Sequence, residues 1–104
     1  MSDFCVVMTT ASSEESARRL IDAALGQQLS ACVQTLPMNS HYVWKGEIMR
    51  EAEVLLLFKA KTADYAALEA AIRAAHDYET PEILRLDVAA GLPAYLAWIV
   101  NSTR

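Results

Sequence analysis

The stretch YVWKGEIMREAEVLLLFKAKT, residues 42–62, is typical of a tight turn that opens a long strand. Gly46 supplies the positive φ that such a turn needs. If Lys45 and Gly46 are the two turn residues, the numbers of facing residues sum to about 91. The strand before the turn then begins near Ser30 and continues to Trp44 through an irregularity at Pro37. Each arm spans roughly 45 Å at about 3.3 Å per residue. This length exceeds what a small domain's sheet can use, so we predict that the tip projects and pairs with another chain.

The segments before the hairpin predict one strand and one helix. Residues 4–10 form a continuous apolar run, which is typical of a central strand covered on both faces. Ser12 and Glu15 have the spacing of a capping box, and the helix that they predict ends at Gly26. Its apolar stripe consists of Ala17, Leu20, Ile21, Ala24 and Leu25.

The segments after the hairpin continue the alternation of helix and strand. Thr62 and Asp64 predict the start of a second helix, which His76 closes. Pro81 favours an extended chain, and residues 83–88 alternate as a strand does. A short amphipathic helix over residues 94–101 follows.

The order β-α-β-β-α-β with an added C-terminal helix predicts an α+β, ferredoxin-like domain over residues 1–104. Its sheet is antiparallel and carries both main helices on one face. The other face then needs cover, which we expect from partner subunits.

Composition narrows the functional classes. The net charge is −4 and the 104 residues contain no run of lysine or arginine, which argues against nucleic acid and anionic membrane partners. The longest apolar runs are of strand length, far below the roughly 20 residues of a membrane helix. Met1 is followed by Ser2 and Asp3, so we expect no signal peptide. Two distant cysteines fit reduced thiols and a cytoplasmic location.

Motifs for catalysis and for metal binding are sparse. The sequence has no G-x-S-x-G, no C-x-x-C and no H-x-x-x-H, and its glycines at 26, 46 and 91 are isolated. We therefore expect a protein that is not an enzyme. Glu47, Glu51 and Glu53 alternate along one strand face, either as a solvated edge or as a functional acidic ladder.

The two cysteines differ in their predicted surroundings. Cys5 falls in the buried run and is predicted to be inert core. Cys32 is predicted to lie opposite Lys59, and a nearby lysine favours the thiolate that reacts or binds soft metals. A packed, unreactive Cys32 is the alternative, and a bulge at Pro37 would shift the register.

These segments together resemble the CutA divalent-cation tolerance family nearly end to end. The resemblance rests on SACVQ (30–34), YVWKGEI (42–48), EVLLLFKAKT (53–62), HDYETPEIL (76–84) and YLAWI (95–99), in this order and spacing. It implies a ferredoxin-like protomer related to PII signalling proteins and assembled as a homotrimer. It also implies tolerance of copper and other divalent metals.

The resemblance places five residues at or near clefts between subunits, namely Cys32, Lys59, His76, Tyr78 and Glu82, and it places Trp44 on the hairpin. It implies metal binding by Cys32, His76 and Glu82, and cleft or ligand-binding positions for Lys59, Tyr78 and Trp44. Copper or another divalent metal is the expected cofactor, and none is expected to be required for folding. Two positions depart from the family: Asp77 stands where proline is frequent, and Met8 stands where some members carry cysteine.

Four functions remain open from the sequence. The first is a trimeric, metal-responsive binding protein. The second is a PII-like sensor of a small anionic metabolite, with Lys59 and Lys61 as charge partners. A trimeric scaffold for another protein is the third, and a hydrolase that uses Cys32 ranks last because no base is visible.

Overall fold

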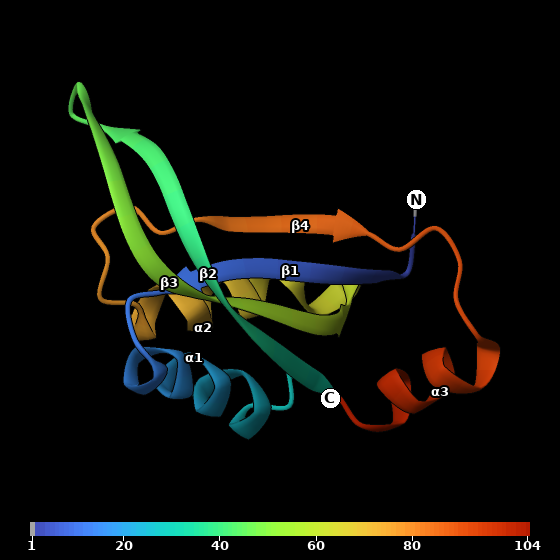
Figure 1. Cartoon of the computed structure of the whole chain (residues 1–104). Coiled ribbons are helices and arrows are strands. Elements are labelled where there is room, and N and C mark those ends of the chain that lie inside the picture. The colour runs from blue at the N-terminus through green and yellow to red at the C-terminus, as the bar shows by residue number, and fades with distance from the viewer. Residues whose placement is uncertain (1) are drawn as a thin grey trace.

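The long hairpin is the most extended feature of the computed structural model, which describes residues 2–104 (Figure 1). Its arms are β2 (Cys32–Trp44) and β3 (Glu47–Lys61). Lys45 and Gly46 both have positive φ, 51° and 83°, as a two-residue type I′ turn requires. Facing residues follow the predicted sum of 91 along the whole hairpin.

Pro37 does not interrupt this pairing, and the predicted irregularity there is wrong. Pro37 faces Val54 in the same register as its neighbours. β2 is an edge strand of the sheet, where a proline is tolerated because its nitrogen can face away from the pairing side. Cys32 therefore faces Lys59, as predicted.

The four strands of the described chain form one antiparallel sheet in the order β2-β3-β1-β4. β1 (Phe4–Ala11) lies in the centre, between β3 and β4 (Ile83–Asp87). β1 pairs with β3 only over residues 54–61. The rest of the hairpin extends beyond the sheet, which confirms the predicted projecting tip (Figure 1).

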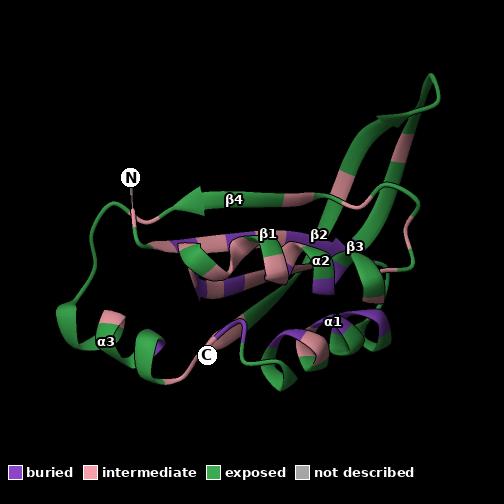
Figure 2. Ribbon diagram, turned by 180° about the vertical axis from the view of Figure 1, so that it is seen from behind, coloured by how far each residue is buried: buried purple, intermediate pink, exposed green. Residues whose placement is uncertain are grey.

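Two helices cover one face of the sheet and form the core there (Figure 2). They are α1 (Glu14–Gly26) and α2 (Tyr65–Ala75), the latter preceded by a 3-10 turn at Thr62–Asp64. The largest fully buried side chains are Phe58, Leu20, Leu29, Leu56, Leu68 and Ile72. The fold class is thus the predicted ferredoxin-like arrangement, with α3 (Pro93–Asn101) as the added C-terminal helix.

The helix starts differ from the prediction by small amounts. Ser13, not Ser12, caps α1, because the side chain of Ser13 accepts the amide hydrogen of Ser16. Adjacent serines are equivalent as caps by residue type, so the sequence did not distinguish them. α2 begins at Tyr65, and Asp64 makes no capping hydrogen bond through its side chain.

The second face of the sheet is apolar but open in a single chain. Along β1, Val6 and Met8 are half-buried on this face, whereas Cys5 and Val7 are buried under the helices. Leu84 and Leu86 of β4, which pair with β1 there, are 54% and 48% exposed. The predicted burial of the central strand on both faces is therefore incomplete within one protomer. Among residues 2–104, no helix has the length and apolar character of a membrane span.

Candidate functional site

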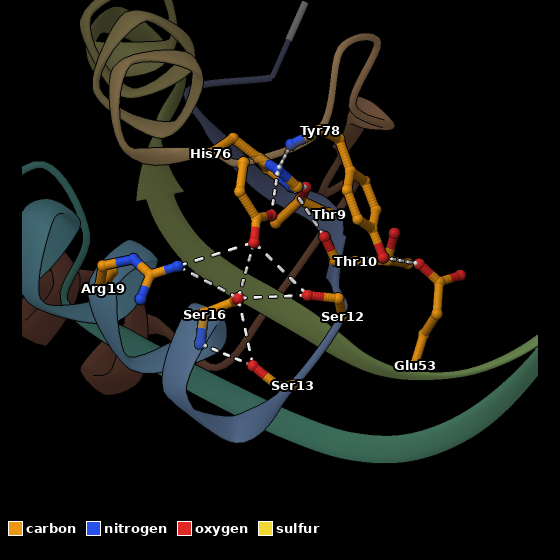
Figure 3. A network of polar contacts seen from close by, with 10 residues as sticks. Thr9, Thr10, Ser12, Ser13, Ser16, Arg19, Glu53, His76 and Tyr78 are labelled. Atoms are coloured by element: carbon orange, nitrogen blue, oxygen red, sulfur yellow. Dashed lines mark hydrogen bonds and ion pairs between the residues drawn. The ribbon is translucent and has the colours of Figure 1, made fainter.

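The segment between α2 and β4, residues 76–82, takes part in a network of polar contacts with other elements of the fold (Figure 3). It starts at His76, directly after the last residue of α2. Its side chains reach three other elements of the structure, β1, β3 and α1. This position brings it beside the projecting part of the hairpin, where it lines a cleft.

The side chain of His76 is buried and only 1% exposed. Its Nδ1 atom accepts the backbone N–H of Tyr78 at 3.2 Å, so Nδ1 carries no proton. The ring proton is then on Nε2, which donates to the carbonyl oxygen of Thr10 at 2.8 Å. Both ring nitrogens are engaged, and His76 would have to give up one of these bonds to bind a metal ion.

Tyr78 connects the same segment to β3. Its hydroxyl group donates to Oε2 of Glu53 at 2.6 Å. Glu53 is only 8% exposed, and a buried carboxylate is stable only with such donors. Burial and the hydrogen bond to Glu53 raise the pKa of Tyr78 well above its ordinary value.

The cleft has a volume of about 660 Å³ and lies between the hairpin and residues 77–82. Its acidic lining consists of Glu51, Glu53, Asp77, Glu79 and Glu82, and its aromatic lining of His41, Tyr42, Trp44 and Tyr78. No lysine or arginine of residues 2–104 lines it. The hydroxyl of Tyr42 donates to Glu51, and this bond raises the pKa of Tyr42 to about 12. The electrostatic character of the cleft thus favours cations.

The structure brings together three of the six predicted site residues. Trp44, Tyr78 and Glu82 all line the cleft. Cys32 and Lys59 lie at the other end of the hairpin, roughly 40 Å from Trp44 by the rise of a strand. Within one chain, Cys32 therefore does not share a site with Glu82.

Lys59 and Cys5 have their own local surroundings. The ammonium group of Lys59 donates to Oε1 of Gln34 at 2.7 Å and lies 5.9 Å from the ring centre of Tyr95. Cys5 is 1% exposed, and burial raises the pKa of its thiol, as expected for a core cysteine. Cys32 is a free cysteine of intermediate exposure.

No three His, Cys, Asp or Glu side chains in the described part of the chain converge as metal ligands. The carboxylates of the cleft make it negatively charged, but in one chain they do not form a complete set of ligands around a metal ion. Further ligands would have to come from water, from side-chain movement or from a second subunit.

Several cleft residues were not predicted from the sequence. Glu51 and Glu53 belong to the alternating glutamates, which the sequence left as either a solvated edge or a functional acidic ladder. For Asp77 and Glu79, the sequence indicated only a turn and no functional role. The pairing of Tyr78 with Glu53 joins residues 25 positions apart, and no local pattern predicts it.

Comparison with known proteins agrees with this architecture. A four-stranded antiparallel sheet with helices on one face and a projecting hairpin defines the class as ferredoxin-like α+β. The CutA1 divalent ion tolerance protein family matches residues 5–102, and the chain belongs to this family.

Individual relatives show the same similarity. The divalent-cation tolerance protein CutA of Yersinia pestis (strain Pestoides F) is 44% identical over 99 residues, which cover 94% of this chain and 83% of that protein. The divalent cation tolerance protein (Cut A1) of Thermus thermophilus superimposes with a TM-score of 0.93 at 38% identity, covering 97% and 99% of the two chains. CutA of Xylella fastidiosa gives a TM-score of 0.95 at 33% identity, covering 99% and 100%.

Proposed function

We propose that this protein is a homotrimeric, metal-responsive binding protein that takes up a divalent cation, copper first among them, at the acidic cleft. The observation that carries the proposal is the lining of the cleft, which has five carboxylates and no lysine or arginine among residues 2–104. Relatives named for divalent-cation tolerance support the class of ligand.

The type of ligand atom bears on the choice of metal. Carboxylate oxygens such as those of Glu82 and Glu79 suit Cu(II) and harder divalent ions, whereas a thiolate suits Cu(I). Cys32 is therefore proposed as the Cu(I) ligand, and Glu82 as the Cu(II) ligand. His76 joins the Cu(II) site only if its bond to Thr10 or to Tyr78 is released.

The trimer is supported by surfaces that a single chain leaves uncovered. Leu84 and Leu86 on the open sheet face, and Val43 and Ile48 near the hairpin tip, are large apolar side chains that are 48–72% exposed. The edge strand β2 runs for 13 residues with an unpaired side. Such edges and apolar faces are usually covered in stable proteins. A second subunit would also be the nearest source of the ligands that one chain lacks.

A sensor of small anions is less favoured by the geometry. Lys59 already bonds Gln34, and Lys61 bonds the carbonyl of Arg104 and lies 3.7 Å from Asp64. Neither lysine lines the acidic cleft.

The protein is further proposed to act without catalysis and in the cytoplasm, where Cys5 and Cys32 remain reduced.

Isothermal titration calorimetry tests the proposed function. Wild type should bind Cu(II), and Glu82→Gln should raise the Kd at least about threefold because one cleft charge is lost. Glu14→Gln is the matched control, since Glu14 is an exposed glutamate on α1 outside the cleft. Under reducing conditions, Cys32→Ser should weaken Cu(I) binding and Cys5→Ser should not.

The outcomes separate the alternatives. Equal Cu(II) affinity in wild type, Glu82→Gln and Glu14→Gln would place the metal outside the cleft. Binding of ATP or an acidic metabolite without binding of Cu(II) would favour the anion sensor.

A further inference from the structure

The first turn of α1 holds the side chain of Asp77, the second residue of the cleft segment. The hydroxyl of Ser16 donates to Oδ2 of Asp77 at 3.0 Å, and the hydroxyl of Ser12 lies 3.5 Å from the same oxygen. Nη2 of Arg19 lies 3.6 Å from it. One carboxylate oxygen is thus surrounded by two hydroxyl groups and a guanidinium group.

Ser16 is the centre of this contact. Its hydroxyl group accepts from Ser13 at 3.2 Å and from Nη2 of Arg19 at 3.2 Å while it donates to Asp77. Ser16 is only 6% exposed, and Figure 3 shows the side chains of Ser12, Ser13, Ser16 and Arg19 gathered at the start of α1. A carboxylate is favoured there by the positive end of the helix and by the cation of Arg19.

Asp77 lies between the two other attachments of the same segment. His76, on one side, bonds the backbone of β1, and Tyr78, on the other, bonds Glu53 of β3. The next residues, Glu79 to Glu82, contribute side chains to the cleft. Three consecutive residues therefore attach the cleft segment to three different elements.

We infer that Ser16 and Arg19 are positioning residues of the cleft: through Asp77 they hold residues 79–82 in the arrangement that presents Glu79 and Glu82 to a cation. Neither Ser16 nor Arg19 lines the cleft, and Asp77 is the cleft residue that both of them contact. The inference rests on the proposed cation binding for its functional consequence. The attachment itself can be tested without it.

Hydrogen exchange tests the attachment directly. Loss of the Ser16 hydroxyl in Ser16→Ala should speed amide exchange at Tyr78, whose N–H bonds Nδ1 of His76, about tenfold relative to Phe58 in the core, since 1.4 kcal/mol corresponds to a factor of ten. Arg19→Gln should speed it about twofold to fivefold, because this pair is exposed. Arg19→Lys, which retains the charge, should lie closer to wild type.

Arg18→Gln is the matched control on the same helix, because Arg18 is exposed and Arg19, not Arg18, contacts Asp77. Exchange in Arg18→Gln should equal that of wild type. Unchanged exchange at the Tyr78 amide in both Ser16→Ala and Arg19→Gln would overturn the inference, whatever the protein binds.

Cu(II) titration of the same variants tests the functional consequence. Ser16→Ala should raise the Kd about threefold to tenfold, and Arg18→Gln should leave it unchanged. Faster exchange with an unchanged Kd would overturn the positioning role while the proposed function stands. If wild type binds no Cu(II), the proposed function fails, and the exchange data still decide whether the attachment to α1 exists.

Discussion

Removing the hydroxyl group of Tyr78 should destabilise the fold more than removing that of Tyr42, the other tyrosine that lines the cleft. In Tyr78→Phe, the carboxylate of Glu53, which is only 8% exposed, loses its donor at 2.6 Å. A hydrogen bond to a charged group contributes about 1.5–3 kcal/mol. We expect a loss of about 2 kcal/mol, toward the lower end because Tyr78 is partly exposed.

Urea denaturation at a fixed protein concentration measures this loss. At a slope of about 2 kcal/mol per molar, the midpoint should fall by about 1 M with an unchanged slope. Tyr42→Phe is the matched control, because its hydroxyl also bonds a glutamate of β3, Glu51, but in an exposed position. Its urea midpoint should stay close to that of wild type, because an exposed hydroxyl group can bond water instead. Equal losses in both variants would refute the role assigned to the buried bond.

The pH dependence of the difference gives an independent check. The pKa of Tyr78 is raised in the folded protein by burial and by the bond to Glu53. A raised pKa means that the stabilisation is complete below the unfolded value of about 10 and is lost as pH rises toward the folded value. The gap between wild type and Tyr78→Phe should therefore shrink above about pH 10. A gap that stays constant to the highest pH tested would contradict this mechanism.

Three further predictions concern the hairpin, the thiols and the assembly. Gly46→Val should lower the free energy of unfolding by roughly 1 kcal/mol or more, because valine is strained at a φ of 83° even where no atom beyond the neighbouring residues lies within 4 Å of the new Cβ. Thermal melting measures this loss, and unchanged melting would show that the turn tolerates a β-branched residue. A thiol reagent should modify native Cys32 and leave Cys5, which is 1% exposed, until unfolding; equal rates would contradict the assigned burial. Sedimentation equilibrium at micromolar concentration should give about three times the chain mass of 11.5 kDa, and a folded species of 11.5 kDa would exclude the trimer.

Most of the fold followed from local patterns in the sequence. The turn at Lys45 and Gly46 fixed the hairpin register, so the pairing of Cys32 with Lys59 could be predicted from two residues. Periodicity predicted the helices to within a few residues. The misses, at Ser12 and Pro37, came from choices that local sequence does not decide: which of two serines caps a helix, and which side of an edge strand a proline faces.

The candidate site was less predictable, because its contacts join residues that are far apart in the chain. The resemblance to a family supplied Trp44, Tyr78 and Glu82, which do share a cleft. It gave no indication that both nitrogens of His76 bond the backbone, or that Asp77 reaches α1. These contacts depend on how the segment at 76–82 lies on the sheet and helices, which only the folded structure shows.

Anomalous diffraction from a crystal soaked in Cu(II) tests the central proposal most directly. A copper peak is expected in the acidic cleft, within coordination distance of Glu82 and bordered by the hairpin that carries Trp44. A well-occupied peak elsewhere, with the cleft empty at the same copper concentration, would contradict it.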